Sequence, residues 1–293
     1  MSLPIPASEL ILHPDGSVYH LALRPEHIGD TIITVGDPER VKLVSRHFSK
    51  LEFTRERREF VTHTGKWKGR RITVISTGIG TDNIDIVLNE LDALVNIDLA
   101  TRQPKAEQRS LNIIRIGTSG ILSEKLPIGS LLISSHAVGL DGLLHYYERT
   151  PSAEEQRMTD TLTAALGDRL PLAPYVTTAD ADLLRTLGQG MQEGVTLTAP
   201  GFYAPQGRVL RADTRFGLDT LQALADIEVA GRRITNFEME TAGIYGLAQL
   251  LGHRAVSCNA LLANRMVGTF STKPQKIVDR LIERVLESIR QLP

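Results

Sequence analysis

Short apolar runs that end in glycine-containing turns recur along this chain and constrain its fold more than any other feature. The first, TIITVGD, begins at Thr31, and RITVISTGIG repeats the pattern from Arg71 with apolar residues at helical spacing behind it. Strands that alternate with helices favour a mostly parallel or mixed sheet covered by helices. The sequence therefore predicts an α/β protein.

Later segments extend this pattern. A third strand is expected at NIIRIGTSG, Asn112 to Gly120, where the small residues should form a loop. The runs SLLISSHAV, GVTLTAP, RITNFEMET and RAVSCNALLANR predict four more strands. An amphipathic helix is expected from Pro274, because apolar residues recur there every three to four positions. No long linker, repeat or low-complexity tract interrupts the chain, so residues 1–293 are predicted to form a single domain.

Charge and composition argue against several classes of protein. The 33 basic and 34 acidic residues nearly cancel, which disfavours a nucleic-acid or anionic-membrane surface. The single cysteine, Cys258, lies in an apolar run and is expected in the core. Neither His136 nor His145 has a spaced partner for a metal, so no metal site is predicted. No stretch resembles a signal peptide or a membrane span, and a cytoplasmic protein is expected.

Arginines follow several of the predicted strands, and ligands of such sheets bind at the carboxyl ends of strands. In GDPER, Gly36 permits close approach of a backbone N–H, and Arg40 falls in the first turn of a predicted helix. RIGTSG adds Arg115 and the hydroxyl of Thr118, and RREF adds Arg58. Such groups suit phosphate, although each motif alone also fits a helix start, a tight turn or a solvated charge run.

The segment TAPGFYAPQGRVLRAD, residues 198–213, is unusually equipped for a loop. It carries an aromatic pair at Phe202 and Tyr203, followed by Gln206 and Arg208 with one glycine between them. Aromatic faces, an amide and a guanidinium together suit a flat polar ligand. Neither a Walker-type lysine loop nor G-x-G-x-x-G is present, so nucleoside triphosphates and dinucleotides have little support as that ligand.

Taken in order, the motifs GDPERV, RREF, STGIG, RIGTSG, FYAPQGR, NFEMET and LLANR resemble the nucleoside phosphorylases of the trimeric or hexameric kind, and within them the uridine phosphorylases. The resemblance runs from His20 to Arg265. It implies a three-layer α/β/α fold whose central mixed sheet forms a distorted barrel. It also implies a pentosyltransferase, a glycosyltransferase that converts uridine and phosphate reversibly into uracil and ribose 1-phosphate in pyrimidine salvage or catabolism.

The resemblance assigns a role to each motif. The residues that it implies for phosphate are Gly36, Arg40, Arg115 and Thr118, with Arg58 from a neighbouring subunit. Those implied for the ribose are Glu238, Met239 and Glu240, with His20 from a neighbouring subunit. Those implied for the base are Phe202, Gln206, Arg208 and Arg265. Of all these, Arg208, Gln206 and Arg115 are expected to be catalytic. Glu238 and Glu240 are interpreted as pointing to opposite faces of a strand, with separate roles.

Two further expectations follow from the same likeness. Purine-directed relatives carry Ser-Asp-His at the strand end where this chain has Ala263, Asn264 and Arg265, so a pyrimidine is favoured. No cofactor is expected besides phosphate as co-substrate. A monovalent cation near Glu59 is possible, although Asn83 stands where a serine is expected. The protein is expected to form a dimer or a hexamer with shared active sites.

Three alternatives stay open at this point. The nearest is a phosphorylase of purine or broad specificity that accepts thymidine or 2′-deoxyuridine. A hydrolytic nucleosidase would need a carboxylate to activate water, and it would not need the arginines. A nucleoside-binding protein without catalysis is the third alternative.

Overall fold

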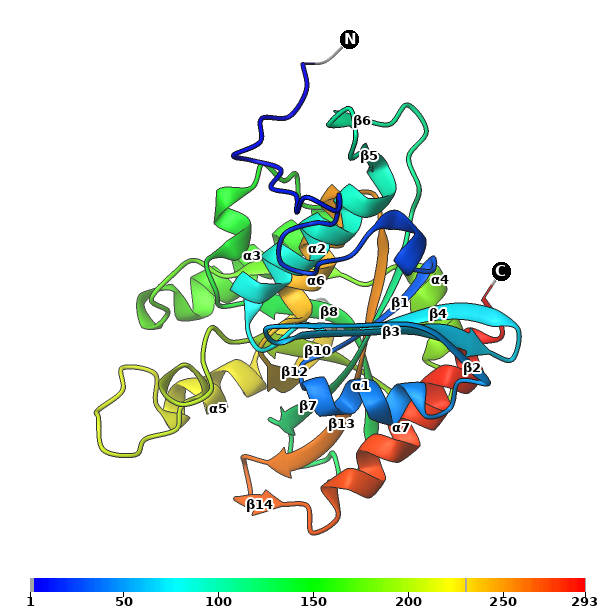
Figure 1. Cartoon of the computed structure of the whole chain (residues 1–293). Helices are drawn as coiled ribbons and strands as arrows, with labels where there is room; N and C mark the ends of the chain where they lie inside the picture. The colour runs from blue at the N-terminus through cyan, green and yellow to red at the C-terminus, as the bar shows by residue number, and fades with distance from the viewer. Residues whose placement is uncertain (1–2, 230, 293) are drawn as a thin grey trace. The chain divides into compact units, whose positions relative to one another are not determined.

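The computed structural model describes residues 3–229 and 231–292 (Figure 1). Within them the chain divides into two compact units. The first comprises the residues up to Ile114 together with Leu247–Arg254, and the second comprises Arg115–Gly246 together with the residues from Ala255 onward.

The first unit is built on strands in the order β1-β4-β3-β2. β1 (Thr31–Val35) and β4 (Arg70–Ser76) are parallel, and β3 (Phe60–Trp67) pairs antiparallel with β4 and with β2 (Lys50–Arg57). All five residues of β1 are buried, as a strand covered on both faces requires. The remaining elements of this unit are the 3₁₀ helix η1 (Pro25–His27), α1 (Pro38–Ser45), α2 (Thr81–Asn96), β5 (Ile97–Asp98) and β6 (Gln103–Pro104).

The GDPER motif begins a helix, as predicted. The side chain of Asp37 accepts a hydrogen bond from the backbone N–H of Glu39, and Pro38 occupies the first helical position of α1. A capping carboxylate and a proline at that position are both typical of a helix start. Arg40 therefore stands in the first turn, where its backbone N–H donates to the carbonyl oxygen of Asp37 at 3.0 Å.

Five strands, most of whose residues belong to the second unit, close into a barrel. They are β7 (Asn112–Ile121), β8 (Leu131–Gly139), β10 (Gln192–Thr198), β12 (Arg232–Glu238) and β13 (Arg254–Asn264). β10 lies between β12 and β8 and is parallel to both. β13 pairs antiparallel with β8 and is followed by β7 in the strand order. Antiparallel pairing between β7 and β12 closes the ring. This mixed barrel confirms the predicted fold class.

One local prediction is wrong, because the segment Gly117–Gly120 is strand rather than loop. Gly120 pairs with Phe237 across the closing ladder, and a Cβ at Gly120 would lie 3.2 Å from the Phe237 ring. The glycine thus leaves room for the aromatic ring at the point where the barrel closes. A strand without bulky side chains resembles a loop in sequence. The reason for the small residues, the Phe237 ring on the partner strand, is visible only in the structure.

The other elements of the chain complete the fold. The predicted C-terminal helix is α7 (Pro274–Ile289), which contacts α4 and buries the apolar stripe expected for it. None of the helices among the described residues is both long and apolar enough to cross a membrane. The remaining elements are α3 (Ala153–Leu166), α4 (Ala181–Leu187), α5 (Leu218–Asp226), α6 (Thr241–Leu250), β9 (Tyr175–Thr178), β11 (Glu228–Val229), β14 (Thr269–Phe270) and the 3₁₀ helices η2 (Leu143–Tyr146), η3 (Gly167–Arg169) and η4 (Ala204–Gln206).

The packing of α7 gives a test of the fold. Leu281 is fully buried, so Leu281→Ala should lower the free energy of unfolding by about 2–5 kcal/mol through lost burial and the cavity left behind. Glu283→Ala on the exposed face of the same helix should change it by less than about 0.5 kcal/mol. Urea unfolding of the full chain measures both, and equal effects of the two substitutions would contradict this arrangement of α7.

Candidate active site

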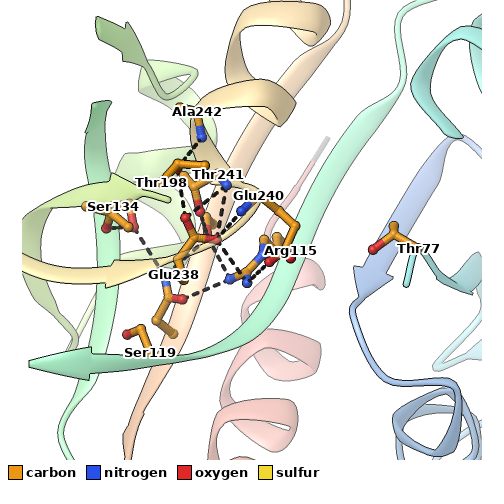
Figure 2. A network of polar contacts seen from close by, with 12 residues as sticks. Thr77, Arg115, Ser119, Ser134, Thr198, Glu238, Glu240, Thr241 and Ala242 are labelled. Carbon is orange, nitrogen blue, oxygen red and sulfur yellow. Dashed lines mark hydrogen bonds and ion pairs between the residues drawn. The ribbon is translucent and has the colours of Figure 1, made fainter. Parts of the chain in front are cut away.

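A buried ion cluster lies at the end of β12 in the second unit. Nη2 of Arg115, from β7, is 2.9 Å from Oε2 of Glu238 and 2.6 Å from Oε2 of Glu240 (Figure 2). At most 6% of any of the three side chains is exposed. The expectation that the two glutamates point to opposite faces is wrong. Residues two apart on a strand share a face. β12 ends at Glu238, and Glu240 lies just beyond it. Both carboxylates contact the same guanidinium.

Glu238 uses both of its oxygens within the protein. Oε1 accepts a hydrogen bond from Oγ1 of Thr198 at 2.8 Å. Oε2 accepts from the backbone N–H groups of Glu240 at 2.9 Å and Thr241 at 3.0 Å, where α6 begins. A carboxylate at a helix N-terminus is stabilised by those N–H groups and by the helix dipole. Glu238 therefore holds Glu240 and Arg115 in place.

Electrostatics explain why Arg115 stays charged inside the barrel. Burial disfavours the guanidinium, but Glu238 and Glu240 outweigh it and raise the pKa of Arg115 above the ordinary arginine value. One guanidinium against two carboxylates leaves this buried cluster with a formal charge of about −1 when all three groups are ionised.

The loop after β10 brings the predicted base-binding residues together. Nη1 of Arg208 donates to Oε1 of Gln206 at 2.5 Å and to the carbonyl oxygen of Phe202 at 2.6 Å. Its guanidinium carbon lies 3.8 Å from the centroid of the Phe202 ring. The tight fold of this loop depends on Gly207, whose φ of +64° lies in the left-handed region. Gln206 is buried, whereas Phe202 is 51% and Tyr203 54% exposed.

Arg265, which follows β13, joins the same group. Its Nη2 donates to the carbonyl oxygen of Gly207 at 3.4 Å, and its buried Nη1 has no hydrogen-bond partner within the described part of the chain. The guanidinium carbons of Arg208 and Arg265 lie 5.7 Å and 5.9 Å from the centroid of the Phe237 ring. Neither arginine forms an ion pair with a carboxylate among the residues that the structure describes.

This pair of arginines is electrostatically unfavourable without a ligand. Burial and the nearby charge of Arg265 lower the pKa of Arg208 to about 10, and burial lowers the pKa of Arg265. Both groups remain charged at neutral pH. Two cations held beside an aromatic ring without a counter-ion favour a ligand that carries or develops negative charge.

The first unit holds the other predicted phosphate residues. Gly36 follows β1 and the STGIG turn follows β4, and these strands are parallel neighbours, so their carboxyl ends meet. A Cβ at Gly36 would lie 3.4 Å from the carbonyl oxygen of Gly78, whose φ is +70°. Arg40, in the first turn of α1, is partly exposed. Glu59, predicted near a cation, packs close to Gly78, since a Cβ there would lie 3.1 Å from its Cγ.

His20 and Arg58 both lie near Tyr19, which sequence reasoning did not single out. The rings of Tyr19 and His20 are 4.9 Å apart, and the guanidinium carbon of Arg58 is 5.8 Å from the Tyr19 ring. Arg58 is exposed and has a φ of +53° in the turn between β2 and β3. Nδ1 of His20 is 2.6 Å from Oε1 of Glu90, which also accepts from the backbone N–H of His20.

Two predicted ligand residues are only partly buried. Met239, between the two glutamates, and Thr118, on β7, are both half-buried. A cavity of about 650 Å³ adjoins the base loop at Pro200, Ala204 and Pro205 but is lined by none of the predicted ligand side chains. The described residues contain no group of three histidine, cysteine, aspartate or glutamate side chains able to hold a metal ion.

Comparison with known proteins places this chain in a family. The family model described as the phosphorylase superfamily matches residues 30–290. The chain belongs to this superfamily. It is 32% identical over 262 residues to a uridine phosphorylase of Thermococcus kodakarensis, covering 89% of this chain and 83% of that one. It is 24% identical to a DeoD-type purine nucleoside phosphorylase of Colwellia psychrerythraea, covering 92% and 98%. Both relatives are pentosyltransferases.

Solved structures agree with this membership. A Trypanosoma brucei nucleoside phosphorylase, described as showing uridine phosphorylase activity, matches with a TM-score of 0.88 and 29% identity, over 97% of this chain and all of that one. A uridine phosphorylase of Phytophthora capsici matches with a TM-score of 0.70 at 23% identity, over 99% of each chain. The second likeness concerns the fold alone.

The buried cluster of this superfamily member gives a stability test. Glu238→Ala should lower the free energy of unfolding by about 3–5 kcal/mol, because a buried ion pair and the acceptors at the start of α6 are lost together. Glu238→Gln should cost less, since an amide oxygen still accepts from the backbone N–H groups. Guanidinium chloride unfolding compares the two. A glutamine variant as unstable as the alanine variant would contradict the role of Glu238 as acceptor.

Proposed function

We propose that this protein is a phosphate-dependent nucleoside phosphorylase that acts on uridine and yields uracil and ribose 1-phosphate. One observation carries the proposal: positively charged groups lie near Phe237, and a negatively charged cluster includes the next residue, Glu238. Among the described residues, two arginines without carboxylate partners lie near the Phe237 ring, and a cluster with an excess carboxylate includes Glu238. The names of the uridine phosphorylase relatives support the same reaction.

Glycosidic cleavage creates the charge pattern that this arrangement would stabilise. As the bond between C1′ and N1 breaks, its electron pair goes to the base and positive charge builds on the sugar. Fixed groups of the opposite sign at each end lower the barrier because they need no reorganisation during the reaction. An oxygen of phosphate then forms the new bond to C1′, so the products are the uracil anion, which takes up a proton, and ribose 1-phosphate.

The base side of the site supports uracil as the leaving group. The guanidinium of Arg208 is a donor only, so the Gln206 atom that faces it is the amide oxygen, and the orientation of that amide is set. We assign Gln206 to the polar edge of the base, Arg208 and Arg265 to the charge that develops on it, and Phe202 to its face.

The sugar side is assigned to Glu240 and Met239. The contact with Arg115 keeps the carboxylate of Glu240 oriented, and a fixed carboxylate can accept hydrogen bonds from two neighbouring ribose hydroxyls. Arg115 and Thr118 are proposed phosphate ligands, and Gly36 and Arg40 keep the same proposed role. His20 and Arg58 are proposed to serve the ligand of a neighbouring copy in a homo-oligomer.

A purine substrate is disfavoured by the strand end at Asn264. Its Oδ1 accepts from the backbone N–H groups of Met266 and Val267, and its Nδ2 donates to the carbonyl oxygen of Ser123. The amide stabilises the turn that leads to β14, and it has no acidic proton to donate to a base. Protonation of a purine nitrogen from this position would require a different residue.

One assay tests the proposal against its alternatives. The protein is incubated with uridine, thymidine and inosine, each with and without phosphate, and base release is followed. Uracil release that requires phosphate is expected. Release without phosphate would indicate a nucleosidase, preferential release of hypoxanthine would indicate a purine phosphorylase, and release from none of the three would overturn the enzymatic assignment.

Substitutions at the base loop separate catalysis from binding. Arg208→Ala should lower kcat by about 10²–10³, because a preorganised donor to the developing anion is lost. Phe202→Ala should chiefly raise the KM for uridine, since an exposed aromatic ring contributes contact to substrate and transition state alike. Steady-state kinetics at saturating phosphate measure both. Parental turnover by Arg208→Ala at saturating uridine would rule out the leaving-group role.

The proposed chemistry needs no metal or organic cofactor. Extensive dialysis against a chelator is therefore expected to leave kcat unchanged.

Replacing potassium by a large organic cation tests the monovalent cation proposed near Glu59, and a loss of activity that potassium restores would support that site.

A further inference from the structure

We infer that Asn259 is a positioning residue that fixes the rotation of the Arg115 guanidinium, and through it the binding of phosphate; this inference rests on the proposed function. Asn259 lies on β13, is fully buried, and its Oδ1 accepts a hydrogen bond from Nη1 of Arg115 at 2.9 Å. The ion pairs at 2.9 Å and 2.6 Å with the two carboxylates are made by the other terminal nitrogen, Nη2.

The orientation of the Asn259 amide is determined by its neighbours. A guanidinium can only donate, so the atom that faces Arg115 must be the amide oxygen. Nδ2 then faces two hydroxyls, and it donates to Oγ of Ser134 and to Oγ of Ser257, each at 3.2 Å. Both polar atoms of the side chain, Oδ1 and Nδ2, are therefore placed without ambiguity.

A chain of hydroxyls anchors this amide to the barrel wall. Oγ1 of Thr196 donates to Oδ1 of Asn236 at 3.0 Å, so its proton is not available to Ser134. In the 2.6 Å contact between Ser134 and Thr196, the donor must then be Ser134. Every proton points the same way, from Asn259 through Ser134 and Thr196 to Asn236. A fully satisfied buried network of this kind resists rearrangement.

A second anchor connects Asn259 to the start of α6. Oγ of Ser257 accepts from Oγ1 of Thr241, whose backbone N–H donates to Glu238. Ser257 and Asn259 are two residues apart on β13 and so point to the same side. The amide is thereby tied to the helix terminus that carries the two carboxylates, and Figure 2 shows Ser134, Thr241 and Arg115 around this network.

The consequence for Arg115 is geometric. Contacts at Nη2 alone leave a planar guanidinium free to swing about that nitrogen, whereas a firm contact at Nη1 fixes its plane. Nη1 also lies 3.5 Å from Oγ of Ser257, at the limit of a hydrogen bond, so the 2.9 Å contact with Asn259 is the one that fixes the guanidinium. Loss of the Asn259 oxygen should therefore leave the contact with Glu240 in place while misdirecting the remaining donors. Phosphate binding should suffer, and nucleoside binding should be spared.

Asn259→Ala tests this, with Asn96→Ala as the matched control. Asn96 is also a buried asparagine, and its side chain makes three hydrogen bonds, to Asp92 and to the backbone of Arg109, rather than to the proposed ligand residues. Both variants should lose thermal stability. Only Asn259→Ala should raise the KM for phosphate, by on the order of 10- to 100-fold, with the KM for uridine changed less than about threefold.

The outcomes separate this inference from the proposed function. An inactive parent protein would overturn the proposed function and the inference with it. An active parent in which Asn259→Ala and Asn96→Ala shift the KM for phosphate equally, or in which Asn259→Ala raises both KM values alike, would overturn the inference only.

A second variant decides the case in which Asn259→Ala does not fold. Asn259→Asp keeps an oxygen toward Nη1 of Arg115 and adds a carboxylate that competes with phosphate for the guanidinium. A selective rise in the KM for phosphate is expected. A KM for phosphate equal to that of the parent would overturn the inference.

Discussion

The structure of the second unit depends on keeping one charged guanidinium inside a barrel. A buried ion is tolerated only when partners replace the water that it has lost. Arg115 meets this condition with Glu238, Glu240 and Asn259, and each partner requires support of its own. The end of β12, the first turn of α6 and the polar interior of the barrel are all parts of that support.

The closing ladder between β7 and β12 links this cluster to the base loop. Phe237 pairs with Gly120 in the ladder and receives the guanidinium groups of Arg208 and Arg265 near its ring, while the next residue, Glu238, belongs to the cluster. Because two successive residues of one strand face in opposite directions, a single peptide unit separates the two environments. A displacement of β12 would disturb both at once.

Much of this could be predicted from the sequence, and the rest could not for identifiable reasons. The strands at TIITV and RITVIS, the stripe of α7 and the capped start of α1 are local patterns, and the structure confirms them. The association of Gln206 with Arg208 is also local. The strand character of Gly117–Gly120 depends on a ring 117 residues away in sequence, between Gly120 and Phe237. No local pattern reports such a contact.

Asn259 shows the same limit at the candidate site. In sequence it is a single polar residue inside an apolar run, and the hydrogen bond that defines its role spans 144 positions. Its one local signal is Ser257, a second polar residue two positions earlier in the sequence. Together they indicate that this face of β13 is polar rather than apolar. The convergence of Glu238 and Glu240 was missed for a different reason, since the spacing of two residues already placed both on one face of an extended chain.

The separation of charge explains why a barrel suits this chemistry under the proposed function. The negative cluster is built on strands and on a helix terminus, where a hydrogen-bonded interior fixes its geometry. The positive pair stands on the loop after β10 and at the end of β13, outside the ladder. The pentose and the phosphate change little among the candidate substrates uridine, thymidine and inosine, and rigid elements suit groups that vary little. The base is the part that differs, and a loop can change its side chains without disturbing the barrel. Selection of the base is therefore physically separable from stabilisation of the sugar cation.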